Sequence, residues 1–370
     1  MVLADRVAQA LSRSTAQGWP DHFLLAAQQY TDPAWEPVEQ QRIFHQSWQY
    51  VGDAAQLELG QVWALTLAGR PVVIARDRAG TLRAFLNVCP HRAALLCEAG
   101  IHTQKHLVCP YHAWTYDLAG GLVGTPSRQR FPDSFEPTDY DLQPVRLETW
   151  SGFMFLCFCD NAPPLVEFLG RVPRYLGQHR RKETRHLLTL RRTVACNWKN
   201  YHDNTLCDYH VAIAHHHTLH PVQGPIKHYV HEFDTYVNLL RTPVTNAWRD
   251  SNQRLADLPE VAGTHFFTFG IYPNLHLLGL PDSTIIWLRI DPVTAQTCHL
   301  TLEIYGIPGI SPPVSTLKTD FEAFMAEDIA LTESVQQGYA SGTYQPGPVN
   351  QLEHRIVHQQ QLIAQALQLD

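Results

Sequence analysis

Two short segments of the chain carry the same pair of side chains. The first is Cys89-Pro90-His91-Arg92, the second is Cys109-Pro110-Tyr111-His112, and 17 residues separate His91 from Cys109. Each segment offers one thiolate and one imidazole, and its proline restricts the backbone and stiffens the loop. Because two matched loops can present four ligands to one place, the pattern predicts that this part of the chain folds around a metal centre.

Two cysteines and two histidines are the ligands of a Rieske [2Fe–2S] centre, in which one iron takes both thiolates and the other takes both imidazoles. Zinc accepts the same four groups, but zinc fingers pair cysteine with cysteine and histidine with histidine. Buried free cysteines beside incidental histidines would explain one such segment better than two matched ones. We therefore interpret Cys89, His91, Cys109 and His112 as ligands of a [2Fe–2S] cluster.

The composition excludes several classes of protein. The chain has 370 residues, a net charge of −7 and no long basic run, so we expect no nucleic-acid-binding surface. It contains no stretch of about 18 uncharged apolar residues, which argues against a membrane span. Met1 to Arg13 has the pattern of an amphipathic helix without a signal-peptide core. Eight cysteines are too few for a disulfide framework, and we expect a cytoplasmic protein or one of an equivalent reducing space.

Hydrophobic patterning divides the chain into three parts. Residues 1–40 begin as a helical segment that we expect to pack on the C-terminal domain. Residues 41–160 are predicted to form a small all-β domain, with strands at 62–67, 71–74, 82–88, 107–108, 114–116 and 152–158. Residues 161–370 begin with a linker around Pro163-Pro164 and are predicted to form an α+β domain. Its predicted strands are 189–196, 230–240, 265–272, 275–280, 284–290 and 297–306, and its predicted helices are 198–217, 317–337 and 350–369.

Three segments of the β domain resemble a known family. Ser47–Gly52, Arg83–Arg92 and Cys109–Asp117 are similar to the Rieske domain of aromatic-ring-hydroxylating oxygenase α subunits, and the resemblance extends over nearly the whole chain. It implies a C-terminal catalytic domain of helix-grip fold, with long helices on an antiparallel sheet, that holds a mononuclear Fe(II). It also implies a homotrimer. Ala93 and Ala113 stand where the family commonly has glycine.

The resemblance further implies an iron site made of two histidines spaced His-x₄-His and one distant carboxylate. His210 and His215 have this spacing. On an ideal α-helix their side chains would point about 140° apart, so we expect the helix to break between them, with residues 214–217 in the break. His216 and His220 form a competing pair at i, i+4 spacing, which would bind a metal or lie on a surface.

Asp328 is the predicted carboxylate ligand. It lies on an apolar stripe of the helix predicted at 317–337, where a buried charge needs a partner. It also falls where the family carries its metal carboxylate, whereas Glu327 and Glu333 are expected to point elsewhere. Two histidines and one carboxylate with open positions form the facial triad of non-haem Fe(II) oxygenases. A salt-bridged core residue is the alternative explanation for Asp328. The other members of the stripe are Phe321, Met325 and Val335.

One position departs from the family pattern. Three residues before the first iron-binding histidine, the family usually has an acidic residue that links the cluster of a neighbouring subunit to the iron site. This chain has Cys207 there, and a thiol is a weak hydrogen-bonding group. We expect Asp208, or else Asp203, to take over this catalytic role, although a different electron path and impaired coupling remain alternatives.

The expected reaction requires a partner protein. No Gly-x-Gly-x-x-Gly segment follows a strand and no plant-type ferredoxin cysteine run is present, so electrons must come from a separate reductase or ferredoxin. The resemblance implies that the cluster passes them to the Fe(II), where O₂ is activated. The product would be a hydroxylated, dihydroxylated or demethylated small organic compound.

The residues alone leave open which kind of substrate the pocket binds. They also leave open two functions other than an oxygenase for this chain. The predicted lining would hold an aromatic ring or enclose a quaternary ammonium group by cation–π contacts. One rival function is a Rieske electron-transfer or redox-sensing protein without an active mononuclear iron, and another is a zinc-stabilised binding protein. About three irons per chain would indicate the oxygenase and two the electron-transfer protein. The predicted pocket residues are Phe267, Phe269, Tyr272, Leu278 and Trp287.

Overall fold

The computed structural model describes residues 18–369, so the helix expected over Met1 to Arg13 lies outside the described residues. The described chain forms two compact units. One unit comprises residues 44–165, and the other comprises residues 18–43 together with residues 166–369. The N-terminal segment therefore belongs to the same unit as the C-terminal half of the chain. No helix among residues 18–369 is long and apolar enough to cross a membrane.

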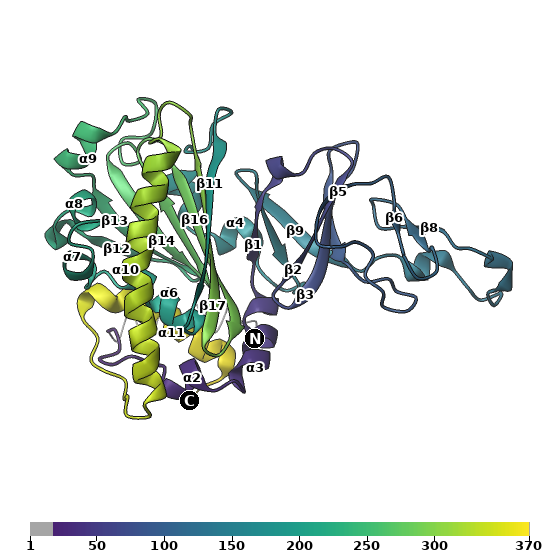
Figure 1. Cartoon of the computed structure of the whole chain (residues 1–370), viewed down its shortest axis with the longest axis horizontal. Coiled ribbons are helices and arrows are strands. Elements are labelled where there is room, and N and C mark those ends of the chain that lie inside the picture. The colour runs from purple at the N-terminus through teal and green to yellow at the C-terminus, as the bar shows by residue number, and fades with distance from the viewer. Residues whose placement is uncertain (1–17, 370) are drawn as a thin grey trace. The chain divides into compact units, whose positions relative to one another are not determined.

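The unit of residues 44–165 is built from two antiparallel sheets. Seven strands follow the order β1-β10-β9-β4-β3-β2-β5, and a small sheet follows the order β6-β7-β8 (Figure 1). A buried hydrophobic cluster that includes Leu107, Trp114 and Tyr116 lies beneath the two loops of interest. The strands are β1 (Gln49–Asp53), β2 (Gln61–Leu67), β3 (Arg70–Arg76), β4 (Leu82–Leu86), β5 (Gly100–Thr103), β6 (Leu107–Val108), β7 (Thr115–Tyr116), β8 (Leu122–Gly124), β9 (Pro144–Trp150) and β10 (Phe153–Cys157).

The two Cys/His segments form loops of the same backbone design. One connects β4 to β5 and the other connects β6 to β7. In the first loop Cys89 N donates to Ala94 O (2.8 Å) and Ala93 N donates to Cys89 O (2.9 Å). In the second loop the corresponding bonds join Cys109 N to Trp114 O (2.8 Å) and Ala113 N to Cys109 O (2.9 Å). The similarity of the two segments therefore reflects one local structure used twice.

Each of these loops holds an alanine in the left-handed region, with φ of 59° at Ala93 and 56° at Ala113. A Cβ atom in this region costs on the order of 1 kcal/mol, which glycine avoids. We expect Ala93→Gly and Ala113→Gly each to stabilise this unit by about 0.5–1 kcal/mol, because the relief of the left-handed strain outweighs the larger entropy that glycine loses on folding. Thermal unfolding followed by the visible absorbance of the cluster tests this, and a lower midpoint in both variants would contradict it.

The second unit contains one antiparallel sheet of seven strands in the order β11-β17-β16-β15-β14-β13-β12. The long helix α10 crosses one face of this sheet (Figure 1). The segment predicted as one strand over 230–240 is instead a hairpin, because β12 pairs with β13. The strands are β11 (Arg185–Val194), β12 (Val230–Phe233), β13 (Val237–Pro243), β14 (His265–Ile271), β15 (Leu275–Gly279), β16 (Ile285–Thr294) and β17 (Thr297–Gly306).

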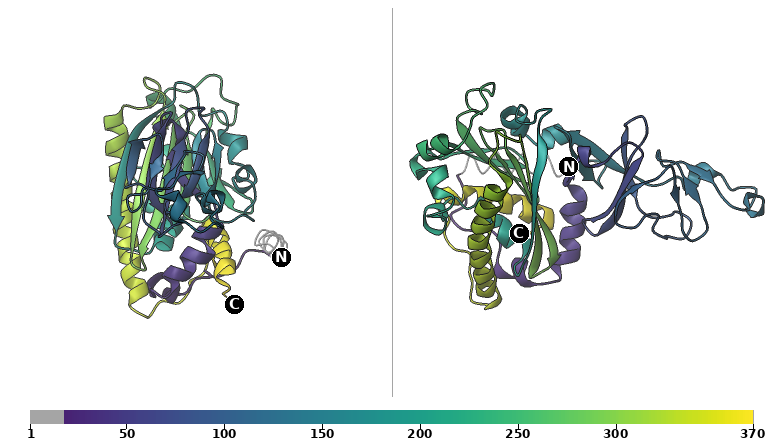
Figure 2. Two further views of the ribbon diagram at one scale, coloured as in Figure 1. Left: turned by 90° about the vertical axis from the view of Figure 1, so that its right-hand side faces the viewer. Right: turned by 45° about the horizontal axis from the view of Figure 1, so that its top comes forward.

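Helices surround this sheet and join distant parts of the chain. The N-terminal helices α2 and α3 pack beside α10 and α11 (Figure 2). Glu39 of α3 forms a buried ion pair with Lys199 of α6 and accepts a hydrogen bond from Trp198 Nε1. The helices are α2 (Ala27–Thr31), α3 (Trp35–Arg42), α4 (Leu165–Phe168), α5 (Val172–Leu176), α6 (Trp198–Leu206), α7 (Val211–Ala214), α8 (His220–Gln223), α9 (Asn246–Ser251), α10 (Val314–Ala340) and α11 (His354–Leu367).

The buried stripe of α10 differs in part from the prediction. Met325 and Asp328 are buried as expected, but Val335 is 42% exposed. The stripe continues instead through polar residues: Thr332 donates to the Asp328 carbonyl, and Gln336 Oε1 accepts from Asn197 N. Hydrogen bonding rather than hydrophobicity therefore decides which residues of the second half of α10 face inward.

Candidate metal centres and active site

The four predicted cluster ligands lie at the tips of the two matched loops. Cys89 and Cys109 are buried free cysteines, and the rings of His91 and His112 lie 4.6 Å apart between centroids. The Nδ1 atoms of both histidines are buried and have no hydrogen-bond partner among the described residues. A buried polar nitrogen without a partner is costly. Two such nitrogens beside two buried thiols fit a group that takes two sulfur and two nitrogen ligands.

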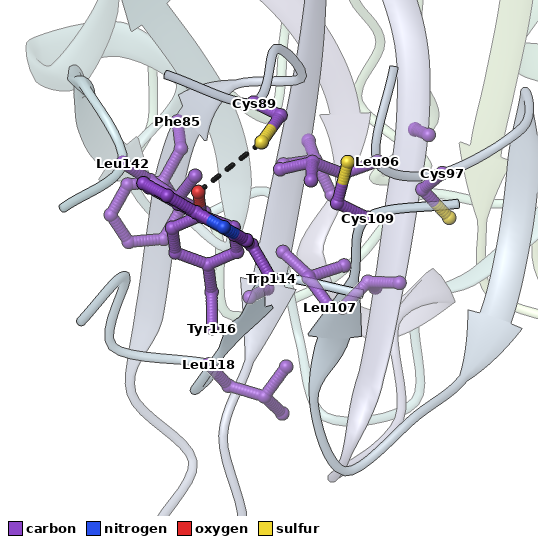
Figure 3. Close-up of a cluster of buried hydrophobic side chains, with 14 of the residues drawn as sticks. Phe85, Cys89, Leu96, Cys97, Leu107, Cys109, Trp114, Tyr116, Leu118 and Leu142 are labelled. Atoms are coloured by element: carbon purple, nitrogen blue, oxygen red, sulfur yellow. Dashed lines mark hydrogen bonds between the residues drawn. The ribbon is translucent and has the colours of Figure 1, made fainter. Parts of the chain in front are cut away.

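Aromatic side chains support this ligand set. The Trp114 ring stacks on His91 with 4.6 Å between centroids and an angle of 7° between planes. The Tyr116 hydroxyl lies 3.3 Å from Cys89 Sγ, a contact shown in Figure 3. Burial raises the pKa of the Cys89 thiol in the metal-free protein. Hydrogen bonding to ligand sulfur is one means by which proteins set a cluster's reduction potential, and Tyr116 is placed to provide it.

The histidines at positions 210 and 215 flank one short helix. Helix α6 ends at Leu206, where the approach to β14 is so close that a Cβ on Gly270 would lie 2.3 Å from Leu206 Cδ2. His210 then precedes α7 and His215 follows it. The expected interruption after residue 214 is present, because α7 ends at Ala214 and residues 215–217 form a turn. A second break, over residues 207–210, precedes α7, and the residues between the two histidines stay helical. This arrangement brings the two side chains together, as a continuous helix would not.

Three side chains converge at this point. His210 Nε2 and His215 Nε2 lie 3.1 Å apart, and Asp328 Oδ1 lies 3.6 Å from the first and 3.0 Å from the second. One possible ligand atom from each of the three residues lies within 4.8 Å of the ligand atoms of the other two. Asn204 Nδ2 donates to Asp328 Oδ1 (2.6 Å) and orients the carboxylate. Two imidazoles and one carboxylate in this proximity suit a non-haem iron.

The metal-free site has strongly perturbed protonation equilibria. Burial by itself would lower the pKa of His210, but Asp328 and Cys207 outweigh it and raise the pKa to about 9. Burial likewise opposes the effect of Asp328 and Glu327 on His215, whose pKa is also raised. For Asp328, burial is outweighed by the two histidines and Asn204, which lower its pKa. At neutral pH the metal-free site is therefore an imidazolium–carboxylate cluster.

This protonation predicts how metal binding depends on pH. Since a metal must displace the proton of His210, we expect the Fe(II) affinity of the iron-depleted site to rise between pH 6.5 and about 9, by about tenfold per pH unit for each proton released. The same raised pKa stabilises the folded metal-free protein most fully below pH 6.5, and this contribution is lost as the pH rises through about 9. Anaerobic competition titrations at several pH values measure the affinity; an affinity independent of pH would contradict the prediction.

Glu327 was expected to point away from the site, and the structure contradicts this. Its Oε2 atom lies 2.7 Å from His215 Nδ1 and accepts a hydrogen bond from the Thr218 hydroxyl (2.6 Å). A carboxylate on the outer nitrogen of a metal-binding histidine fixes the ring and its tautomer. Glu333 does point elsewhere, since its carboxylate accepts from Ala195 N. The sequence signal for Glu327 is only its position next to Asp328.

The structure gives the two proposed replacements for the missing acidic residue other partners. Asp208 is buried, and its carboxylate accepts from Arg355 Nη1 (3.0 Å) and lies 2.8 Å from His231 Nε2. Asp203 accepts from the hydroxyl of Tyr30 (2.6 Å) and from Gln360 Nε2 (3.0 Å), and burial raises its pKa to about 7. No hydrogen bond or ion pair of the described residues joins either carboxylate to His210, so their role stays a prediction.

A cavity of about 510 Å³ opens onto the three-residue site. Of the predicted pocket residues, Phe267 and Leu278 line it, whereas Phe269, Tyr272 and Trp287 are buried elsewhere in the core. The competing histidines are not part of it: neither His216 nor His220 is among the described lining residues. The aromatic residues of the lining are Trp248, Phe266, Phe267, Phe321 and Phe324.

The charged residues of this lining are all acidic or histidine. Asp208, Asp320 and Asp328 contribute carboxylates, and none of the described lining residues is lysine or arginine. Sequence reasoning missed Trp248, Phe266 and Phe324 as lining residues. Their side chains come from α9, β14 and α10, and hydrophobic patterning does not distinguish a residue that lines a cavity from one that fills the core.

Comparison with known proteins agrees with this geometry. A model described as the Rieske [2Fe-2S] domain matches residues 47–145, and one described as the catalytic domain of ring-hydroxylating alpha subunits matches residues 175–369. The chain is 27% identical to the glycine betaine monooxygenase oxygenase subunit of Pseudomonas aeruginosa, over 89% of this chain and 85% of that protein. It is 28% identical to the chloroplastic choline monooxygenase of Beta vulgaris, over 86% and 71% of the two chains.

A solved structure has the same fold. A quaternary ammonium Rieske monooxygenase, described as giving insight into carnitine oxidation and inter-subunit electron transfer, matches with a TM-score of 0.79 and 26% identity. The match covers 94% of this chain and 96% of that one. The Rieske domain implies a [2Fe–2S] cluster and the catalytic domain a mononuclear iron, as expected from the sequence. The chain belongs to the ring-hydroxylating α-subunit family and is a Rieske-type terminal oxygenase that receives electrons from a separate protein.

Proposed function

We propose that this oxygenase demethylates a small quaternary ammonium compound that carries no carboxylate group. The observation that carries the proposal is the cavity lining, which combines five aromatic residues with carboxylates and contains no lysine or arginine among the described residues. Aromatic faces attract a quaternary ammonium ion, and Asp320 adds a negative charge at the exposed part of the wall. A substrate carboxylate would enter this lining without a cationic partner, which is unfavourable.

The substrates named for the relatives all contain a quaternary ammonium group, which supports such a group in the substrate of this chain. These substrates differ in the rest of the molecule. Glycine betaine and carnitine carry a carboxylate, whereas choline does not, and all three contain a quaternary ammonium group. Naphthalene dioxygenases share the fold at 19% identity or less, and this likeness supports the fold alone. The lining therefore favours a choline-like cation over betaine-like zwitterions and over neutral aromatic hydrocarbons.

The residues have separate roles in this proposal. Cys89, His91, Cys109 and His112 hold the cluster. His210, His215 and Asp328 hold the iron, which supplies O₂ activation when bound. The chain's own contribution is to orient these ligands through Asn204 and Glu327 and to keep the substrate cation against the aromatic wall.

The proposed reaction consumes one O₂, two electrons from the separate donor and two protons. One N-methyl group of the substrate becomes an N-hydroxymethyl group and one water is released. The hydroxymethyl group then leaves as formaldehyde with loss of a proton, which yields the tertiary amine. We also propose a homotrimer in which one subunit's cluster serves the iron of its neighbour, in line with the inter-subunit electron transfer described for the solved relative.

A substrate panel with a surrogate reductase tests the proposal. We expect formaldehyde release from choline-like cations with kcat/KM at least about tenfold above that for glycine betaine and carnitine, and no oxidation of naphthalene. Asp320→Asn should raise KM for the cation with little change in kcat, since it removes only a binding charge. Equal kcat/KM values for cations and zwitterions would contradict the proposal that the substrate carries no carboxylate group. Two irons per chain instead of about three would favour the electron-transfer alternative.

A further inference from the structure

The two histidines of the iron site differ in what holds their outer nitrogen atoms. His215 Nδ1 lies 2.7 Å from the Glu327 carboxylate. His210 Nδ1 is buried and has no hydrogen-bond partner among residues 18–369. A metal-binding histidine almost always donates its second N–H to a carboxylate, a carbonyl or water. The described residues therefore provide a hydrogen-bond acceptor for the outer nitrogen of His215 but none for that of His210.

Two residues from distant parts of the chain meet beside His210. Cys207 follows α6 and lines the cavity together with His210. The Cys207 thiol is directed at Glu353 Oε1, 4.0 Å away. A carboxylate therefore lies next to the thiol that precedes His210 by three residues.

Glu353 is held in place by its own local structure. Its Oε2 atom accepts from Asn350 N (2.9 Å), and the Asn350 side chain accepts in return from Leu352 N (3.0 Å), in a capping box at the start of the C-terminal helical segment. One carboxylate oxygen is therefore fixed by the backbone and the other is left for Cys207. A capping box accepts glutamine as well as glutamate at this position, so the charge of Glu353 is not needed for the cap.

We propose that Glu353 is a positioning residue for His210 and acts through Cys207. In the iron-loaded site, His210 Nδ1–H would donate to the Cys207 sulfur, a contact that the described structure does not contain, and the thiol S–H would donate to Glu353. Glu353 thus supplies, from the C-terminal segment, the carboxylate that position 207 lacks. The inference rests on the proposed role of His210 as an iron ligand. It competes with the prediction for Asp208 and Asp203. The Asp208 carboxylate is engaged by Arg355 and His231. Asp203 Oδ2 is engaged by Tyr30 and Gln360, whereas Asp203 Oδ1 has no partner among the described residues.

The test is a set of variants of the full chain loaded with cluster and iron. Glu353→Gln should lower the Fe(II) affinity of the mononuclear site and slow single-turnover oxidation of the reduced cluster, each by about tenfold or more. Its thermal midpoint should stay at the parent value, because glutamine keeps the cap. Adding Cys207→Asp in the Glu353→Gln background should restore both quantities, since it returns a carboxylate directly to His210.

Controls distinguish the possible failures. Glu333→Gln, on the far half of α10 from the site, should match the parent in iron affinity and cluster oxidation. If Glu353→Gln also matches the parent while Asp208→Asn loses cluster oxidation, Glu353 has no such role and the Asp208 prediction stands. A loss in Glu353→Gln that Cys207→Asp leaves unrestored would reduce Glu353 to a structural role. A parent protein with only two irons per chain would instead contradict the proposed function itself.

Discussion

Asp328→Ala is expected to abolish oxygenation while leaving the Rieske cluster intact. Asp328 is the only carboxylate among the three described side chains that converge at the proposed iron site, and it is 1% exposed. Its loss leaves only His210 and His215 of the three converging side chains, and two imidazoles without the carboxylate do not complete the facial triad. Loss of a catalytic metal removes several kcal/mol of transition-state stabilisation, which corresponds to a decrease in rate of about a thousandfold or more.

Iron analysis and visible absorbance measure the two effects separately. The variant should contain about two irons per chain and the parent about three, with the same cluster spectrum in both. Glu327→Gln is the matched control on the adjacent residue: it removes an outer contact of His215 and should cost about 10–100-fold in iron affinity or activity rather than all of it. An Asp328→Ala variant that keeps its third iron would show that the carboxylate ligand lies elsewhere.

Arg355→Met is expected to destabilise the C-terminal unit by about 3–5 kcal/mol. Arg355 is fully buried, and its guanidinium donates to Asp208, to Asn238 Oδ1 (2.9 Å) and to the Thr268 carbonyl (3.0 Å). Removing the cation leaves the buried Asp208 carboxylate with His231 as its one ionic partner among residues 18–369. An uncompensated buried charge of this kind has a cost in the stated range.

Urea unfolding followed by tryptophan fluorescence measures this loss, and cluster absorbance reports on the other unit independently. Arg192→Met is the control, because Arg192 and Glu322 form a half-exposed pair that contributes about 0–1 kcal/mol. If both arginine variants lose the same small amount, the buried network does not stabilise this unit. The Arg355 result also bears on catalysis, since Asp208 lines the cavity and requires its partner to stay in place.

Short-range features of the site could be predicted from the sequence. The Cys89/His91 and Cys109/His112 loops each lie within a few residues, and their shared pattern corresponds to one backbone structure with the same two hydrogen bonds. The spacing of His210 and His215 likewise indicated an interrupted helix, and the interruptions lie before and after α7. Asp328 was predicted as the carboxylate of the iron site because a charge on an inward-facing stripe of a helix requires a partner. In each case the information lies within a few turns of one segment.

The sequence could not predict the contacts between side chains that lie far apart along the chain. Glu327 reaches His215 across 112 residues, Glu353 reaches Cys207 across 146, and Arg355 reaches Asp208 across 147. Hydrophobic periodicity indicates which face of a helix is buried and does not indicate what that face meets. The docking of α10 and α11 against the end of α6 decides these contacts. The sequence by itself therefore predicted the ligand sets of the two metal centres, and only the tertiary structure decided which other carboxylates lie beside them and what lines the cavity.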